Sequence, residues 1–182
     1  MRHPGGQDDS DGEAFWRFSL ALYSRPGIAE ALIRVQDRAA RDVNVILFGL
    51  WLGACQGRLL DAGDLADAEA AIAPIVASAV APLRHLRRQL KAPVNPDPDP
   101  DPDIQALRRR IAGLETAAER RVQYRLAAQA SRISGAAPEE DGLAAAQANL
   151  ALYLGDEAGS PEAGVLRRAL ASLIRRAERS QH

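Results

Sequence analysis

Apolar residues recur along the chain at spacings of three and four positions, the pattern of amphipathic helices, and no stretch alternates apolar and polar residues as a strand would. The pattern is clearest in the segment 26–40, where Ile28, Leu32 and Val35 share one face and charged residues take the opposite face. Cap and turn residues divide the chain into helices expected near 10–24, 26–40, 43–56, 64–91, 104–134, 138–154 and from 160 onward. The sequence therefore predicts an all-α fold, an irregular bundle of six to seven helices with a Pro-Asp linker.

The segment 43–56 is apolar on nearly every side, so it is expected to be the central, buried helix of the bundle. Gly49, Gly53 and Gly57 recur at intervals of four residues along it. Each glycine costs a helix about 1 kcal/mol, and a row of them at this spacing predicts a second helix packed unusually close on that side. Gly57 has an alternative role as the C-terminal cap, which would shorten the row to two.

Prolines indicate where helices are interrupted. Pro74 and Pro82 fall inside the expected helix 64–91, where each removes a backbone hydrogen bond and predicts a kink or a division into two shorter helices. The alternating prolines and aspartates at the chain's centre favour an extended, solvated linker that belongs to no core. The expected organisation is a disordered tail at 1–10, an N-terminal helical core at 11–92, the linker at 93–103, and C-terminal helices at 104–182 packed on the same bundle.

Polar residues with capping chemistry predict where helices begin. Ser10 followed by Glu13 has the spacing of a capping box, and Asp42 and Asp64 are expected N-caps. After the linker, a continuous apolar seam is expected along the helix 104–134. Its members are Ile104, Leu107, Ile111, Leu114, Ala118, Val122 and Leu126.

Composition sets limits on class and compartment. The formal net charge of −1 indicates neither a nucleic-acid nor a membrane partner for the chain as a whole. The single cysteine, Cys55, excludes an internal disulfide and is expected to be a buried, unreactive thiol. The N-terminal residues contain no apolar signal segment, and the longest apolar run, 45–55, has about half of the ~20 residues that a membrane span needs. A cytoplasmic location without a membrane partner is the expectation.

Two amide side chains stand among apolar neighbours where the second and third expected helices meet. Gln36 lies within the apolar face of 26–40, and Asn44 lies in the first turn of the next helix, on the side of Trp51. A buried amide without a partner costs about 1–3 kcal/mol, so each needs the other, a backbone group or a ligand. In the structural interpretation Asp42 is a cap, Asp37 forms an i,i+4 ion pair, and the amides join two helices. In the functional interpretation these side chains face a ligand.

The first expected helix has aromatic residues on two faces. Trp16, Ser19 and Tyr23 share one face through their i, i+3 and i+7 spacing, while Phe15 and Phe18 lie on another. Such a helix is either sandwiched in the core or lines a groove for a ligand or partner with one face. The candidate ligand-binding residues are Gln36, Asp37, Asp42, Asn44, Trp51, Trp16 and Tyr23.

Basic residues concentrate on two helices. Their candidate surface comprises Arg84, Arg87, Arg88 and Lys91, together with Arg120, Arg121 and Arg125. A solvated charged face is the simpler interpretation, and cations near a helix C-terminus also suit the helix dipole. A phosphate- or RNA-binding surface is the alternative. Neither a helix-turn-helix nor an RNA-binding motif accompanies these arginines, so a nucleic-acid partner is not the leading expectation.

The run from Phe15 to Gly57 resembles a family of small proteobacterial proteins known only as a domain of unknown function. The matching elements are Phe15-Trp16, Phe18-Ser19-Leu20, Leu22-Tyr23, Pro26-Gly27, Gln36-Asp37, Asp42-Val43-Asn44 and Leu50-Trp51. The resemblance is specific over about the first 60 residues, and it implies a bacterial protein without assigning it an activity or a catalytic residue.

The motifs of known enzymes are missing from this sequence. The three histidines are scattered, one cysteine cannot build a zinc site, and neither a phosphate-binding glycine loop nor a nucleophile elbow occurs. No catalytic residue, metal or cofactor is therefore expected. The leading hypothesis is a non-catalytic interaction or scaffolding protein with a protein partner or a second copy of itself. The alternatives are a small-molecule-binding protein or enzyme using the polar cluster near Asn44, and an RNA- or phosphate-binding protein.

Overall fold

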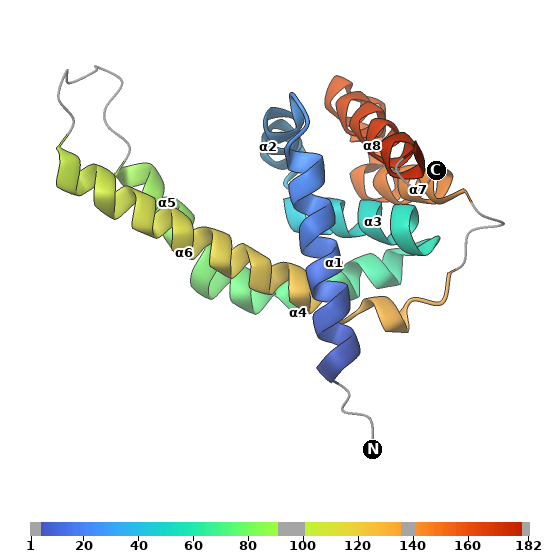
Figure 1. Ribbon diagram of the computed structural model, residues 1–182, viewed down its shortest axis with the longest axis horizontal. Helices are drawn as coiled ribbons and strands as arrows, with labels where there is room; N and C mark the ends of the chain where they lie inside the picture. Colours follow the sequence, from blue (N-terminus) through green and yellow to red (C-terminus); the bar gives the residue numbers. More distant parts are fainter. Residues whose placement is uncertain (1–4, 91–100, 136–140, 180–182) are drawn as a thin grey trace.

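The fold is an irregular bundle of helices around one continuous hydrophobic core (Figure 1). The structure, a computed structural model, describes residues 5–90, 101–135 and 141–179. The elements are α1 (Gly5–Tyr23), α2 (Ile28–Ala39), α3 (Val43–Gln56), α4 (Ala62–Ile75), the π-helical turn η1 (Val76–Val80), α5 (Ala81–Gln89), α6 (Pro102–Ala127), the 3₁₀ turn η2 (Ala130–Arg132), α7 (Gly142–Leu154), the 3₁₀ turn η3 (Gly155–Gly159) and α8 (Pro161–Arg179). The described residues contain no strand, so the predicted all-α class is confirmed.

Helix α3 is the centre of the molecule, as its apolar sequence predicts. All its residues from Asn44 to Gly53 are buried. Its Trp51 stacks against Phe15 of α1 with ring centroids 5.2 Å apart, and Phe48 lies 5.9 Å from the same Phe15 ring. Aromatic rings in such contact add stabilisation beyond the area that they bury. Trp51 is therefore a core residue.

The predicted close approach along the α3 glycines is made by α7. A methyl group on Gly53 would lie 2.6 Å from the carbonyl carbon of Ala145, well inside van der Waals contact. A methyl group on Gly49 would lie 3.3 Å from Cβ of Asn149. Gly57 takes the other predicted role, because it ends α3 with a left-handed φ of 60°.

A buried asparagine fixes the close α3–α7 pair. The Asn149 side chain donates to the carbonyl oxygens of Gly49 and Arg58, each at 2.9 Å, and accepts from the Leu60 N–H at 2.8 Å. Three hydrogen bonds satisfy the buried amide and supply partners to one backbone group inside α3 and to two in the segment that follows it. Sequence analysis did not single out this residue.

Several helix boundaries differ from those expected. Helix α1 begins at Gly5, so Ser10 lies inside it and is not a cap. Asp61, not Asp64, caps α4, and Asp64 is the reciprocal member of its capping box. Asp101 caps α6, which places the last residues of the expected linker in that helix; residues 91–100 lie outside the described part. For α4, Asp61 and Asp64 lie three positions apart and each accepts from the backbone N–H of the other.

The long helix between residues 62 and 89 is continuous but changes its winding. Pro74 lies in the last turn of α4 and Pro82 in the first turn of α5, with the π-helical turn η1 between them. The π turn accommodates the backbone hydrogen bonds that the prolines disrupt. By length and composition alone this helix could cross a membrane, which is weak support for a span because helices of folded domains pass the same test.

Helices α5 and α6 form an antiparallel hairpin that extends away from the rest of the bundle (Figure 1). The expected apolar seam of α6 is buried only in part: Val122 and Leu126 are in the core, whereas Ile104, Leu107 and Leu114 are exposed. The reason is that α1, α3 and α4 also pack against α6, whereas its outer half has mainly α5 as its neighbour. Helix α7 packs along α3, and α8 packs along α2.

The expectation that Cys55 is buried is wrong. Its side chain lies at the exposed edge of α3, near the C-terminal end of that helix. Surrounding protein atoms nevertheless raise the pKa of the thiol to about 11, so the thiolate is scarce at neutral pH.

Candidate functional site

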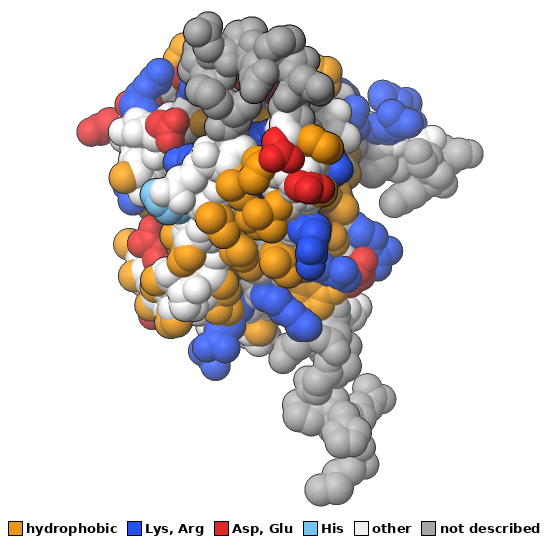
Figure 2. All heavy atoms as spheres, turned by 90° about the vertical axis from the view of Figure 1, so that its left-hand side faces the viewer, with side chains coloured by type: hydrophobic (Ala, Val, Ile, Leu, Met, Phe, Trp, Pro, Cys, Tyr) orange, Lys and Arg blue, Asp and Glu red, His pale blue; other side chains and the backbone are white. Residues whose placement is uncertain are grey.

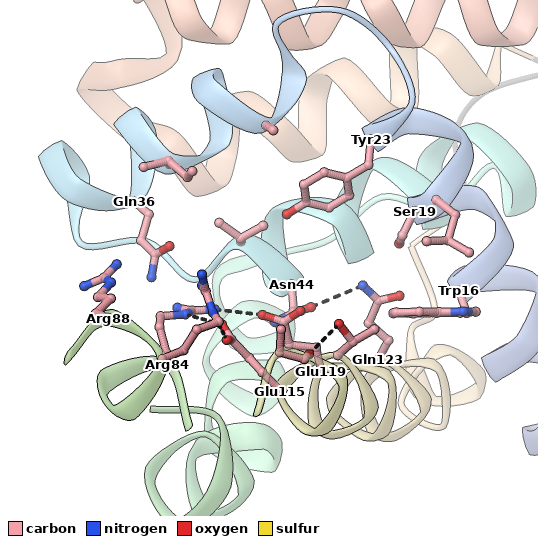
Figure 3. A pocket seen from close by; sticks show the side chains of 17 residues that line it. Trp16, Ser19, Tyr23, Gln36, Asn44, Arg84, Arg88, Glu115, Glu119 and Gln123 are labelled. Carbon is pink, nitrogen blue, oxygen red and sulfur yellow. Dashed lines mark hydrogen bonds and ion pairs between the residues drawn. The ribbon is translucent and has the colours of Figure 1, made fainter. Parts of the chain in front are cut away.

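A cavity of about 410 Å³ lies where the α5–α6 hairpin meets α1, α2 and the start of α3 (Figure 3). This volume is within the range of small-molecule sites, about 300–1,000 Å³. Its wall residues follow helical spacing, for example residues 16, 19, 20 and 23 of α1 and residues 112, 115, 116, 119 and 123 of α6. The full lining is Trp16, Ser19, Leu20, Tyr23, Ala29, Ile33, Gln36, Val43, Asn44, Arg84, Arg87, Arg88, Ala112, Glu115, Thr116, Glu119 and Gln123.

An amide pair forms the floor of the cavity. The Asp42 side chain caps α3 by accepting from the Asn44 N–H at 2.7 Å, which places Asn44 in the first turn of that helix. Gln123 Nε2 of α6 then donates to Asn44 Oδ1 at 3.2 Å. The partner of Asn44 is thus a residue from a distant helix, and Gln36 stands separately on the cavity wall.

Two buried polar atoms on this wall have no partner in the protein. Ser19 is 1% exposed and Gln123 is 2% exposed, yet Ser19 Oγ and Gln123 Oε1 make no hydrogen bond. Both residues line the cavity. Buried polar atoms are nearly always satisfied in folded proteins, so two unsatisfied atoms on residues that line the same cavity indicate a place for a molecule that supplies the missing bonds.

Arginines of α5 and glutamates of α6 form an ion-pair network at the opposite end of the cavity. Arg84 contacts Glu115 at 3.2 Å and Glu119 at 2.8 Å, and Arg87 contacts Glu115 at 2.5 Å. Burial raises the pKa of Glu115, but hydrogen bonds and charge from Arg87 and Arg84 outweigh burial and hold that pKa below its ordinary value. Burial raises the pKa of Glu119 above its ordinary value, because the single bond from Arg84 compensates only in part.

A third arginine leaves this end of the cavity with surplus positive charge. Arg88 lines the cavity and makes no ion pair with any residue that the structure describes. Three arginines against two glutamates give the lining a formal charge of +1, since 3 − 2 = 1. Figure 3 shows Arg84 and Arg88 at one side of the cavity, Trp16 and Ser19 at the other, and Asn44 between them.

The remaining wall is apolar or aromatic. Leu20, Ile33 and Val43 stand beside the rings of Trp16 and Tyr23. Burial raises the pKa of Tyr23 to about 12, so its hydroxyl stays protonated at neutral pH and is available as a donor. The cavity therefore combines an aromatic and apolar wall with two separate polar ends.

The structure divides the predicted ligand-binding residues into two groups. Trp16, Tyr23, Gln36 and Asn44 line the cavity. The other three lie elsewhere. Asp37 is exposed on α2, Asp42 is a helix cap, and Trp51 is in the core.

The structure also separates the predicted basic surface. Arg84, Arg87 and Arg88 line the cavity, whereas Lys91 lies outside the described residues. The arginines at the far end of α6 have other partners: Arg120 bonds to Glu13 and Tyr124, Arg125 donates to the Ala71 carbonyl, and Arg121 is exposed. The seven basic residues therefore do not form one continuous face.

The sequence analysis missed the α6 side of the cavity. Glu115, Glu119 and Gln123 recur every four residues, so they occupy one stripe of α6 beside its apolar seam. The arginines of α5 form a stripe of opposite charge at similar spacing. Matching acidic and basic stripes on two helices joined by a short linker predict an antiparallel hairpin, and this signal was present in the sequence.

Among the residues that the structure describes, no three His, Cys, Asp or Glu side chains gather as a metal-ligand set. The cavity lining supplies hydrogen-bond donors and acceptors, charge and apolar surface. Such groups bind a ligand and orient it.

Comparison with known proteins adds a family and no activity. A family described as a protein of unknown function, DUF2390, matches residues 14–126. The chain belongs to this family. Every residue that lines the cavity falls inside the DUF2390 match, and α7 and α8 lie beyond it. The match extends past the first 60 residues that carry the resemblance, through the Pro-Asp segment to the end of α6. Neither the curated proteins nor the solved structures contain a match.

Proposed function

We propose that this protein binds a small anionic molecule with an apolar or aromatic body in the cavity between α1, α2, α3 and the α5–α6 hairpin. The observation that carries the proposal is Arg88, a cavity residue with no carboxylate partner among the described residues. Arg84 and Arg87 are already engaged by Glu115 and Glu119, which leaves Arg88 free to take the anion. A guanidinium binds a carboxylate or phosphate group through charge-assisted hydrogen bonds.

The opposite wall supports a ligand that is more than an inorganic ion. Trp16 and Tyr23 supply aromatic faces, and Leu20 and Ile33, half exposed in the structure, are covered when a ligand occupies the space. Removing apolar surface from water contributes about 25 cal/mol per Å² to the free energy of binding. An aryl group attached to the anion uses both parts of the cavity.

The ion pairs of Glu115 and Glu119 favour a protein that binds its ligand without catalysing a reaction. Glu115 is held ionised by two arginines, and Glu119 bonds to Arg84, so neither carboxylate stands free as a base. In the described part of the chain, neither a metal-ligand set nor an activated cysteine adds a reacting group. A binding protein is thus the first candidate.

The experiment is a calorimetric titration with phenyl phosphate, compared with inorganic phosphate and phenol. Phenyl phosphate is expected to bind more tightly than either of its parts. Arg88→Ala is expected to weaken its binding about tenfold or more, because a charge-assisted hydrogen bond contributes roughly 1.5–3 kcal/mol. The matched control is Arg121→Ala, an exposed arginine of α6 outside the cavity. Equal binding by wild type and Arg88→Ala, or no binding of phenyl phosphate, contradicts the proposal.

A second candidate function is self-association through the α5–α6 hairpin. Leu86, Ile104, Leu107 and Leu114 are exposed on it, with Leu114 59% exposed. Figure 2, which faces this end of the molecule, shows hydrophobic side chains gathered between charged ones. The outer part of α6 carries Asp101 and Asp103 at its start and exposed Arg109 and Arg110 two turns later, so two antiparallel copies would bring opposite charges together.

Mass measurement by light scattering tests this second candidate. The wild-type chain is expected to form a dimer, and Leu114→Glu, which places a charge in the exposed apolar surface, is expected to be monomeric. Leu152→Glu is a suitable control, since Leu152 is an exposed leucine of α7 away from the hairpin. A wild-type monomer at every concentration tested excludes the homo-oligomer.

A further inference from the structure

Ser19 Oγ and Gln123 Oε1, the two unpartnered buried atoms, indicate which chemical group binds at the end of the cavity beside Trp16. Gln123 Oε1 is a carbonyl oxygen and can only accept, while Nε2 of the same amide donates to Asn44. Ser19 Oγ lies on the same wall and has no partner either. An acceptor in a dry place needs a donor, and leaving it unmet costs about 1–3 kcal/mol. A ligand N–H group supplies that donor.

The donor has to be neutral. The lining already carries an excess of one positive charge, from Arg84, Arg87 and Arg88 against Glu115 and Glu119. An ammonium group brought into the cavity would meet this positive charge and lose its hydration shell. The N–H of an amide, of an aromatic amine or of a ring meets neither cost.

The neighbouring side chains favour a planar ring as the carrier of that N–H. Trp16 and Ser19 stand three residues apart on α1 and share one face, and Tyr23 follows one turn later on the same face. Aromatic faces stack on planar heterocycles and contribute about 1–3 kcal/mol per ring. The unpartnered acceptors thus lie where the edge of a stacked ring would come.

We infer that the cavity takes an anionic ligand whose other end is a planar ring with a neutral N–H donor, the chemistry of a nucleoside monophosphate. This inference rests on the proposed function, since the phosphate would contact Arg88. The ring edge would donate to Gln123 Oε1 and Ser19 Oγ at the opposite end of the cavity, with Tyr23 and Trp16 beside the ring. The arrangement requires an elongated ligand with its charge and its donor at separate ends.

The test compares the four common ribonucleoside monophosphates with ribose 5-phosphate and phenyl phosphate by calorimetry. Ribose 5-phosphate has the anion without the ring, and phenyl phosphate has a ring without an N–H donor. At least one nucleotide is expected to bind about tenfold more tightly than ribose 5-phosphate, as stacking and one hydrogen bond together predict. If no nucleotide binds better than ribose 5-phosphate, the inference is wrong.

Two variants assign the effect to the ring edge. Ser19→Ala and Gln123→Met each remove one acceptor. Each is expected to weaken binding of the preferred nucleotide about fivefold while leaving the affinity for phenyl phosphate unchanged. Gln105→Met on the same helix, outside the cavity, is the matched control. Ser19→Ala removes only a hydroxyl from a helix, so it keeps the test informative even where Gln123→Met lowers stability.

The outcomes separate this inference from the proposed function. If phenyl phosphate binds in an Arg88-dependent way and the nucleotides bind no better than ribose 5-phosphate, the ring-edge inference fails and the anion site stands. The inference is also overturned if Ser19→Ala and Gln123→Met weaken the binding of nucleotide and of phenyl phosphate equally. The two side chains would then affect the shape of the whole cavity and not the ring N–H alone. If none of these anions binds, both proposals are overturned.

Discussion

Asn44 and Gln123, 79 positions apart in the chain, meet in a hydrogen bond of 3.2 Å that joins the start of α3 to α6. The bond satisfies one atom of each amide and leaves Gln123 Oε1 without a partner beside the cavity. One polar contact thus joins two helices and also supplies a binding group. Its removal should be visible in stability as well as in binding.

The first prediction concerns this pair. Asn44→Leu leaves Gln123 Nε2 unpaired in a buried place, and Gln123→Met leaves Asn44 Oδ1 unpaired, so each variant is expected to lower the free energy of unfolding by about 1–3 kcal/mol. The double variant replaces both partners by apolar groups and should cost less than the sum of the single changes. Urea unfolding of the four proteins measures the coupling. Simple additivity of the two changes would mean that the bond does not form.

The second prediction uses the charge of Glu115. Its pKa is lowered in the folded state by Arg87 and Arg84, so its stabilising effect is present above the ordinary pKa of 4.5 and is lost as pH falls through the lowered value. Glu115→Gln should therefore lower the free energy of unfolding at pH 7 by about 1–3 kcal/mol, because it leaves two half-buried arginines without their shared partner. The difference from wild type should shrink below pH 4.5. A difference that stays constant between pH 7 and pH 3 would rule out this origin.

The third prediction compares two glycines in helices. Gly53→Ala improves helix propensity by about 1 kcal/mol, yet its methyl group would lie 2.6 Å from the Ala145 carbonyl carbon and push α7 off α3. A net loss of about 2–4 kcal/mol is expected, the range of a core substitution that forces backbone to move. Gly113→Ala in α6 is the control, since nothing lies within 4 Å of its added methyl group. That change should stabilise the protein by up to about 1 kcal/mol, and thermal unfolding measures both.

The fourth prediction is the pH dependence of anion binding. Burial raises the pKa of Glu119, so this carboxyl takes up its proton earlier than an ordinary glutamate as pH falls. Protonation removes a negative charge from the cavity and should tighten anion binding about fivefold, the effect of a unit charge a few ångströms away near water. Arg84 and Glu115 face the same carboxyl. Both keep their charge through this range, since the pKa of Arg84 is raised and that of Glu115 is lowered.

Benzenesulfonate is the probe for this measurement, because its own charge does not change with pH. Its affinity should rise from pH 7 towards the raised pKa of Glu119. Glu119→Gln, which lacks the titrating group, should bind with a flatter pH profile and with the tighter affinity already at pH 7. A wild-type profile as flat as that of the variant would exclude Glu119 from the anion site.

Much of the local structure follows from the sequence because it depends on neighbouring residues. The bounds of α3, its Asp42 cap and its central position follow from an apolar segment with a polar residue at its start and a glycine at its end. The Gly49–Gly53 row predicts a close helix because glycine has no other advantage inside a helix. The predicted Asp64 cap was wrong because Asp61, three positions earlier, has the same capping chemistry, and the Ser10 cap was wrong because the helix continues past it to Gly5.

The tertiary structure decided which polar groups meet. The sequence alone determined an all-α chain, a buried α3 and an unusual pair of amides near its start, since helix periodicity and capping are short-range effects. It did not determine that Asn44 pairs with Gln123 instead of Gln36, or that Arg84 and Trp16 line one cavity, because residues far apart along the chain meet only when whole helices pack. Helix packing depends on the summed burial of many side chains, so no short pattern in the sequence encodes it.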